Sequence, residues 1–312
     1  MIKILMIIAV AVIIVFSVFT TFENETGKNH DSHNSLSSAP FLTLTANISD
    51  PSPQANFKYG YVSPNLWSFD SGSGDAIMSL FSNGSIHTTA YLRGTVSIFG
   101  YPSIHFTQDL PISLQSVYDS NLSSFVSFDI KNASSNVRND VIYDFFLGVG
   151  TTLEYEVEII LFDKAGILNS NTSSNGLVVS IPIQVNKDMK NVSWELNIGT
   201  SQSGNFPDYA FTPDISFNTS GNYLISFSPF LRFLQNNSYI SSTFSILRLG
   251  IGSEFGGSVS PYSAKVLGYD YLSYGFWMYS YFIMNGKEYQ VVQPTSNMSS
   301  SISPSSVPEV KR

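Results

Sequence analysis

The chain has 312 residues, of which 43% are hydrophobic and only 12% are charged, so it can bury a core as one large domain or two small ones. A formal net charge of −8 without a basic patch excludes nucleic acid as a partner, because neutralising phosphates requires such a patch. The sequence has no cysteine, and its four histidines lack the spacing of a metal motif. No phosphate-binding glycine loop precedes a helical segment, and we expect neither a metal nor an organic cofactor.

The N-terminal segment predicts export. Residues 4–22 are almost wholly apolar and follow Lys3, a length between that of a long signal-peptide core and a short spanning helix. No small-x-small cleavage motif follows, so residues 1–22 are interpreted as a signal peptide or, if uncleaved, a membrane anchor. Both alternatives place the remainder outside the cell, secreted or on the outer face of the membrane. Recurrent Asn-x-Ser/Thr sequons agree with this location, although chance produces several in a chain rich in Asn and Ser.

Composition divides the rest of the chain into three parts. Residues 23–40 predict a flexible linker and residues 293–312 a Ser- and Pro-rich tail. Residues 41–292 carry short β-type segments separated by turn residues, which is typical of an all-β domain: a β-sandwich of two antiparallel sheets, expected to be monomeric. The predicted strands are 76–80, 87–93, 95–99, 125–130, 141–147, 155–162, 176–185, 193–198, 215–218, 244–252, 271–284 and an edge strand in 287–292.

One segment, residues 226–235, departs from the strand pattern. Its apolar residues recur at helical spacing, and Pro229 stands at a plausible first helical position. We expect one short helix, packed on the outside of the sheets, with Ser228 as its N-cap.

The strand at residues 153–162 has two different faces, because successive strand side chains point to opposite sides. One face is an apolar row suited to burial, formed by Tyr155, Val157, Ile159 and Leu161. The other is a run of carboxylates ending in apolar bulk: Glu154, Glu156, Glu158, Ile160 and Phe162. The plain interpretation is a solvated face of an amphipathic strand. However, another glutamate, Glu254, lies downstream among glycines, and two carboxylates across a cleft are what glycoside cleavage needs.

Several short motifs then follow one another in a recognisable order between residues 57 and 285. They are Asn65-Leu66-Trp67 with Gly72-Ser73-Gly74, Gly100-Tyr101-Pro102, Tyr143-Asp144, Glu158-Ile159-Ile160-Leu161-Phe162, Ser193-Trp194-Glu195-Leu196 and Gly252-Ser253-Glu254. In order and approximate spacing they resemble glycoside hydrolase family 12, endoglucanases with a concave β-jelly-roll. The resemblance implies the fold of that family: a jelly roll with a substrate cleft.

The resemblance also implies roles for individual residues. Glu158 would be the nucleophile, Glu254 the general acid/base, and Asp144 the neighbouring carboxyl that hydrogen-bonds the nucleophile. Asn65 and Trp67 would bind a glucose unit on the non-reducing side. Tyr101 is a further candidate, since aromatic faces bind the apolar C–H patch of pyranose rings, whereas Trp194 stays open between core and site.

This chain departs from the family pattern on the nucleophile's strand. Ile160 and Phe162 stand where the family carries Met and Trp. Tyr155-Glu156-Val157 also imitates the fungal form of the motif, so Glu156 is an alternative nucleophile. Glu158 is preferred, because the four residues that follow it keep an all-apolar match.

The sequence therefore predicts a retaining endo-β-1,4-glucanase that hydrolyses cellulose-like or mixed-linkage glucans. The competing hypothesis is a non-catalytic carbohydrate-binding or cell-surface structural sandwich. On that hypothesis the aromatics remain useful, Glu254 is a turn residue among glycines, and Asp144 is a hydrogen-bond acceptor at a strand end.

Overall fold

The protein's structure, a computed structural model, describes residues 39–70, 72–131, 136–164, 173–201, 204–215, 218–258 and 272–292. The predicted signal peptide or anchor (1–22), nearly all of the linker (23–40) and the tail (293–312) lie outside the described residues and stay predictions. Within the described ranges, no helix is long and apolar enough to cross a membrane.

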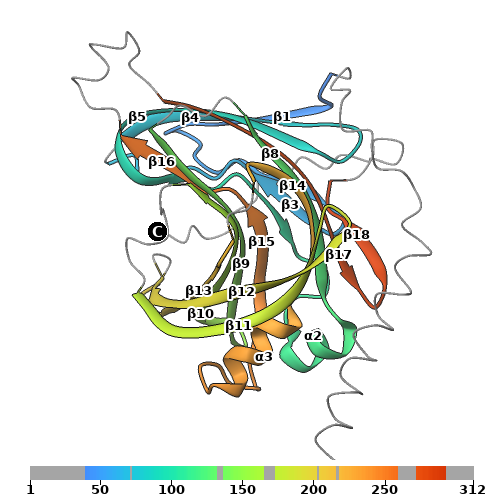
Figure 1. Cartoon of the computed structure of the whole chain (residues 1–312). Helices are drawn as coiled ribbons and strands as arrows, with labels where there is room; N and C mark the ends of the chain where they lie inside the picture. The colour runs from blue at the N-terminus through green and yellow to red at the C-terminus, as the bar shows by residue number, and fades with distance from the viewer. Residues whose placement is uncertain are drawn as a thin grey trace, which may run out of the picture. The chain divides into compact units, whose positions relative to one another are not determined.

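Strands make up most of the described chain, and the all-β prediction is confirmed (Figure 1). The helices are α2 (Leu114–Ser120) and α3 (Ser228–Asn236). The strands are β1 (Leu42–Ala46), β2 (Ala55–Phe57), β3 (Gly60–Ser63), β4 (Gly72–Leu80), β5 (Ile86–Gly100), β6 (Ser103–Phe106), β7 (Ile112–Ser113), β8 (Ser123–Lys131), β9 (Val137–Val149), β10 (Thr152–Lys164), β11 (Ser173–Val185), β12 (Asp188–Thr200), β13 (Pro207–Pro213), β14 (Ser220–Ser226), β15 (Ser245–Gly252), β16 (Phe255–Ser258), β17 (Leu272–Met284) and β18 (Lys287–Gln290).

The strands lie in two layers that are joined by continuous hydrogen bonding. The outer layer runs β1-β4-β5-β17-β8-β14-β11, and the inner layer runs β13-β10-β9-β15-β6-β3-β2. Strand β12 pairs with both β11 and β13 and so connects the layers. The predicted separation into two sheets is therefore not confirmed. The expectation of purely antiparallel pairing is wrong at one place, because β10 and β13 run parallel.

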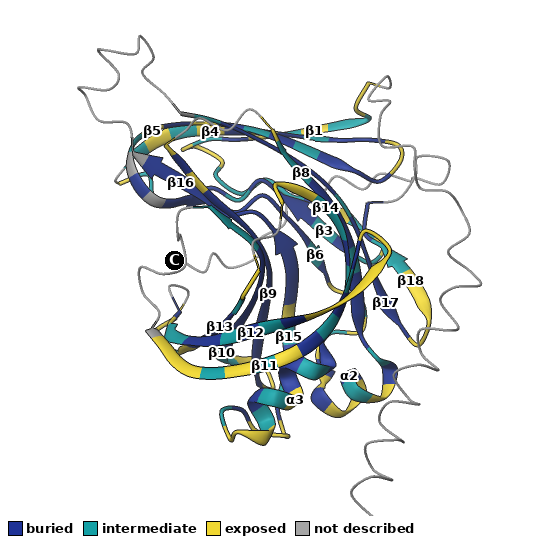
Figure 2. Ribbon diagram, viewed as in Figure 1, coloured by how far each residue is buried: buried dark blue, intermediate teal, exposed yellow. Residues whose placement is uncertain are grey.

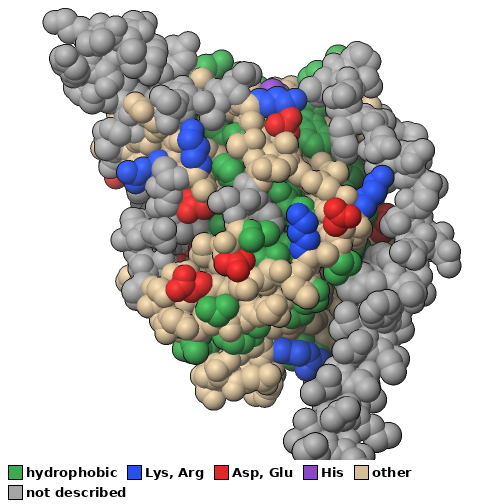
Figure 3. All heavy atoms as spheres, in the orientation of Figure 1, with side chains coloured by type: hydrophobic (Ala, Val, Ile, Leu, Met, Phe, Trp, Pro, Cys, Tyr) green, Lys and Arg blue, Asp and Glu red, His purple; other side chains and the backbone are tan. Residues whose placement is uncertain are grey.

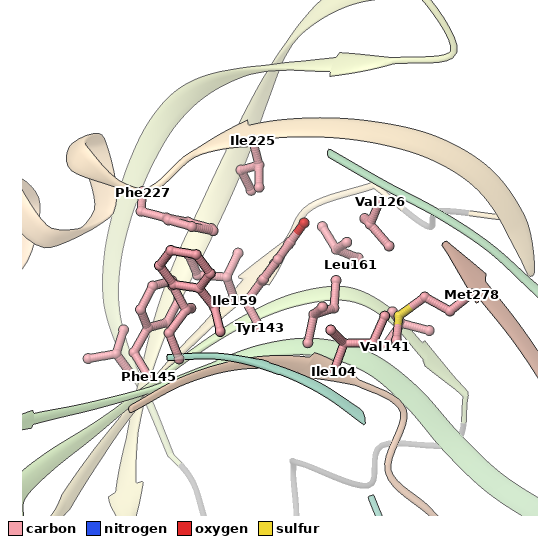
Figure 4. Close-up of a cluster of buried hydrophobic side chains, with 14 of the residues drawn as sticks. Ile104, Val126, Val141, Tyr143, Phe145, Ile159, Leu161, Ile225, Phe227 and Met278 are labelled. Carbon is pink, nitrogen blue, oxygen red and sulfur yellow. The ribbon is translucent and has the colours of Figure 1, made fainter. Parts of the chain in front are cut away.

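The main core fills the space between the layers. In Figure 4, Tyr143, Phe145, Ile159 and Leu161 of the inner layer face Val126, Ile225 and Met278 of the outer layer. Strand β9 is buried along most of its length, whereas β11 carries many exposed residues (Figure 2). The predicted alternation on β10 is confirmed for its apolar row, since Val157, Ile159 and Leu161 all belong to this core.

The other face of β9 and β10 carries a second, smaller cluster. Tyr101, Ile142, Ile160 and Ala210 are buried there, with Trp67 packed against them. We call these residues the concave-face cluster; they lie on the face of β9 and β10 that points away from the main core. Phe162 was expected on this face but packs against the main core. A register shift between Ile160 and Phe162 explains the difference, because one extra residue in a strand changes the alternation.

Helix α3 confirms the predicted helix and its packing on the sheets. Phe230 contacts the rings of Trp194 and Phe211 edge-on, which also assigns Trp194 to the main core. The predicted cap is wrong: Phe227 is the N-cap, and Ser228 lies in the helix with its hydroxyl donating to the carbonyl oxygen of Val117 at 3.2 Å.

Helix α2 was not predicted. Its N-cap is Ser113, whose hydroxyl oxygen accepts from the N–H of Ser116 at 3.1 Å, and it ends at the left-handed Asn121. A helix of seven residues gives too short an apolar pattern to be distinguished from the surrounding strands.

Two strand predictions also need correction. Residues 87–93 and 95–99 form a single strand, β5, which continues through Gly94 at a positive φ of 102°. Ile215 and Asn218 lie outside strands, residues 216 and 217 are outside the described ranges, and the strand that follows, β14, begins at Ser220.

Candidate active site

One row of cross-strand neighbours runs along the concave face of the inner layer. Directly paired residues on adjacent strands share a face, with Cβ atoms about 4.5–5.5 Å apart. The row crosses β3, β6, β15, β9, β10, β13 and β12 and consists of Tyr61, His105, Gly250, Asp144, Glu158, Ala210 and Asn197. The two predicted carboxyls Asp144 and Glu158 are therefore adjacent in this row.

Glu158 lies in an unusually acidic environment. It is only 6% exposed, and its Oε2 has no hydrogen-bond partner among the described residues. Burial raises the pKa of Glu158 well above its ordinary value, and the nearby charges of Asp208, Glu156, Glu254 and Asp144 raise it further. Neighbouring carboxylates repel each other's charge, so this group retains protons at a pH where isolated carboxyls are ionised.

Glu254 is placed by the short connection between β15 and β16. It is 3% exposed, and its charge is one of those that raise the pKa of Glu158. Its backbone N–H donates to Oδ1 of Asp140 at 2.9 Å, and its carbonyl oxygen accepts from the N–H of Asp140 at 3.1 Å. Glu254 therefore belongs to the same cluster of carboxyl groups as Glu158, although 96 positions separate the two residues in the sequence.

Glu156, the alternative nucleophile, has different neighbours. Its partner on β9 is Phe146, and its partner on β13 is Asp208. The hydroxyl of Ser201 donates to Oε2 of Glu156. The carboxyl that faces Asp144 across β9 and β10 is thus that of Glu158, not that of Glu156.

Two of the predicted sugar-binding residues, Trp67 and Tyr101, belong to the concave-face cluster. Trp67 is partly exposed and packs on the concave-face cluster, whereas Tyr101 is 1% exposed, with its hydroxyl donating to the carbonyl oxygen of Ile142 at 3.3 Å. The ring of Tyr101 is therefore too buried to stack on a sugar, and Tyr101 instead packs beneath the site. Asn65 accepts from the Ser52 hydroxyl at 2.9 Å, and its carbonyl oxygen accepts from the N–H of Tyr101.

Three site residues were not predicted from the sequence. Asp208 lies on β13, which was not predicted as a strand. Asp140 lies on β9, one residue before the predicted strand 141–147. His105 lies on β6, stacked on Tyr61 at 4.5 Å between ring centroids. The sequence signal that could have found Asp140 is its position four residues before Asp144, on the same face of a strand.

The described part of the chain contains no group of His, Asp and Glu arranged to hold a metal ion. On the face seen in Figure 3, Lys and Arg side chains are scattered, and Asp and Glu side chains lie among them. The buried carboxyls of the concave face can donate a proton, accept a proton and, when ionised, attack as a nucleophile.

No protein-family model matches the sequence, and no curated protein sequence matches it. Several solved structures, in contrast, are similar to the structure of this chain. A family 12 xyloglucanase from Bacillus licheniformis in complex with ligand has a TM-score of 0.56 and 16% identity, covering 78% of this chain and 99% of that chain. Endoglucanase 3 of family GH12 from Trichoderma harzianum has a TM-score of 0.53 and 21% identity, covering 81% and 100%. The xyloglucanase domain of NopAA from Sinorhizobium fredii, in complex with cellobiose, has a TM-score of 0.51 and 16% identity, covering 77% and 96%.

These similarities define the fold class. The chain has the β-jelly-roll fold seen in glycoside hydrolases of family 12, as the sequence motifs predicted. Its buried carboxyls Asp144 and Glu158 lie in the row that shares the face of the concave-face cluster.

Proposed function

We propose that the protein is a glycoside hydrolase that cleaves internal β-1,4 bonds of a glucan with retention of configuration. One observation carries the proposal: Glu158, Asp144 and Glu254 are all buried on the concave face, and the charges of the other two raise the pKa of Glu158. The fold supports it, because the similar structures are described as endoglucanases and xyloglucanases.

In the proposed reaction the two glutamates act on opposite sides of the scissile bond. Ionised Glu158 attacks the anomeric carbon, while protonated Glu254 gives its proton to the departing glycosidic oxygen. The resulting glycosyl ester on Glu158 is then hydrolysed by water, which loses its proton to Glu254. Both residues return to their starting forms, so the cycle requires no metal or organic cofactor.

Repulsion between neighbouring carboxylates favours a state in which one carboxyl is ionised while another is protonated. Retaining hydrolysis needs one carboxyl to be ionised and another to be protonated at the same pH, with the two about 5–5.5 Å apart. Asp144, directly opposite Glu158, is the group that would exchange a proton with the nucleophile. Burial and mutual repulsion favour retention of a proton within the cluster.

The substrate class follows from the same comparison. We propose a cellulose-like or mixed-linkage β-glucan, with xyloglucan as an alternative because two of the similar structures are xyloglucanases. Asn65 and Trp67 would bind a glucose unit on the non-reducing side. We further propose that the protein acts outside the cell as a monomer, either secreted or held to the membrane by its N-terminal segment.

The test is hydrolysis by the purified protein. It would be incubated with carboxymethylcellulose, barley β-glucan and xyloglucan across the acidic and neutral pH range, and new reducing ends would be followed beside a Glu254→Gln control. Activity that is lost in the control supports the proposal, and NMR of the first product tests retention at the anomeric carbon. Glucan binding without any product, by a protein shown to be folded, would instead indicate a non-catalytic carbohydrate-binding protein.

A further inference from the structure

The connection between β15 and β16 is bonded to Asp140 of β9 through both the carboxyl and the backbone N–H of Asp140. Oδ1 of Asp140 accepts from the N–H of Glu254 at 2.9 Å, and the N–H of Asp140 donates to the carbonyl oxygen of Glu254 at 3.1 Å. These two bonds fix the backbone of Glu254 from both sides of its Cα atom. Asp140 therefore constrains the direction in which the Cα–Cβ bond of Glu254 points.

A second set of contacts holds the residues on either side of Glu254. The hydroxyl of Ser253 donates to the carbonyl oxygen of Asp140 and is also within hydrogen-bond distance of the Tyr274 hydroxyl. Because Ser253 has a single hydroxyl proton, Tyr274 must be the donor in the second bond. The ring of Tyr274 stacks on Phe255 with centroids 5.0 Å apart, so β17 supports the same connection.

The residues of this arrangement are buried. Asp140 and Ser253 are fully buried, and Tyr274 is nearly so. Oδ2 of Asp140 has no hydrogen-bond partner among the described residues. A carboxyl is costly to bury, and an Asn would provide the same Oδ1 acceptor at lower cost. Burial raises the pKa of Asp140, and the nearby charges of Glu254 and Asp163 raise it further.

We propose that Asp140 is a positioning residue for Glu254, which it orients toward the glycosidic oxygen through the bonds to the backbone of Glu254. This inference rests on the proposed function, in which Glu254 is the general acid. Asp140 itself does not contact the substrate; it acts through Glu254, with Ser253 and Tyr274 completing the support.

The test compares substrates that differ only in how much they need a general acid. An aryl β-cellobioside with a dinitrophenyl leaving group departs without protonation, whereas the unsubstituted phenyl analogue requires it. For Asp140→Ala, kcat/KM is expected to fall about tenfold or more on the phenyl substrate, a part of the 10²–10⁴-fold that general acid catalysis contributes. On the dinitrophenyl substrate it is expected to stay within about threefold of wild type, because kcat/KM reports only the first step.

Two further variants separate positioning from general damage. Asp140→Asn retains the Oδ1 acceptor and is expected to restore most of the phenyl-substrate activity that Asp140→Ala loses. Asp163→Asn is the matched control for charge, because Asp163 is the cross-strand partner of Asp140 on β10 and its charge, like that of Glu254, acts on Asp140. It is expected to show no dependence on the leaving group.

The outcomes are distinguishable. Equal losses on both substrates, no loss in Asp140→Ala, or failure of Asp140→Asn to recover activity would each overturn the inference while leaving the proposed function intact. A wild-type protein that is inactive on the dinitrophenyl substrate would instead overturn the proposed function. If Asp140→Ala does not fold, Tyr274→Phe takes its place: it removes one hydroxyl, keeps the ring stacked on Phe255, and is expected to show a smaller loss with the same leaving-group dependence.

Discussion

Glu158 on β10 lies directly opposite Asp144 on β9, and on the other side of Asp144 the strand partner is Gly250, which has no side chain. The ring of His105 occupies the space over Gly250, since a Cβ atom there would lie 2.9 Å from Nδ1 of His105. Asp144 is thus enclosed between an imidazole and a carboxyl. This pairing decides which glutamate of β10 the aspartate acts on.

The first prediction concerns the nucleophile. Glu158→Gln is expected to reduce kcat/KM by at least about 10³-fold, because removing a covalent nucleophile removes a whole catalytic unit. Glu156→Gln is its matched control: the carboxyl lies two residues away on the same face and accepts from Ser201. It is expected to retain most of the activity, since an amide oxygen can accept the same bond.

The measurement is the initial rate of reducing-end release by both variants, with circular dichroism as a check of folding. The reverse result, an inactive Glu156→Gln beside an active Glu158→Gln, would assign the nucleophile to Glu156. It would also mean that the Asp144 pairing has no catalytic role.

The second prediction concerns the acid limb of the pH profile. Burial is the largest cause of the raised pKa of Glu158, and the Asp144 carboxylate is one of the charges that add to it. Asp144→Asn removes that charge, so the pKa of Glu158 is expected to fall. Because the nucleophile must be ionised, the acid limb of kcat/KM should move to lower pH. An acid limb that stays in place, or moves upward, would contradict the assignment.

The third prediction is that stability decreases from mildly acidic to neutral pH. The pKa values of Glu158 and Asp140 are raised in the folded state, chiefly by burial. In the unfolded chain these groups ionise near pH 4. The stabilising contribution is therefore complete below about pH 4 and is lost as the pH rises through the folded pKa values, because the unfolded state releases protons that the folded state retains.

Thermal unfolding at a series of pH values measures this effect. The Tm should be higher at mildly acidic pH than at neutral pH, and Glu158→Gln should raise the Tm at neutral pH and flatten the curve. Groups that are arranged for catalysis commonly lower the stability of the folded state in this way. A Tm that rises steadily from acidic to neutral pH would show that other groups dominate.

The fourth prediction concerns substrate binding by Trp67. This ring packs on the concave-face cluster and is partly exposed. Trp67→Ala is expected to raise KM about tenfold, equivalent to about 1.4 kcal/mol of lost stacking, with a much smaller change in kcat.

Trp194 provides the control for this measurement. It is fully buried in the main core against Phe230. Trp194→Phe is expected to lower the free energy of unfolding by about 1–3 kcal/mol and to leave KM unchanged. Equal effects of both variants on KM would show that Trp67 is only a packing residue.

The strand periodicity and the motif order were sufficient to predict the all-β class, the buried row of β10, the short helix α3 and the jelly roll. These features follow from local patterns, in which alternation and Pro at a helix start act within a few residues. The prediction failed where non-local structure overrides the local pattern. A bulge moved Phe162 to the main core, and Ser228 bonds to Val117 of a distant segment instead of capping its own helix.

The sequence by itself determined which residue types are available: Glu158 and Glu254 in their motifs, no cysteine, and little charge. Only the tertiary structure decided which carboxyls act together, because cross-strand register is set by how β9 aligns with β10 and β15. That register pairs Asp144 with Glu158 and brings Asp140 to Glu254, 114 positions further along the sequence. The parallel register of β10 with β13 likewise brings Asp208 beside Glu156. The pKa values follow from burial and from these neighbours, neither of which is a property of the residues taken alone.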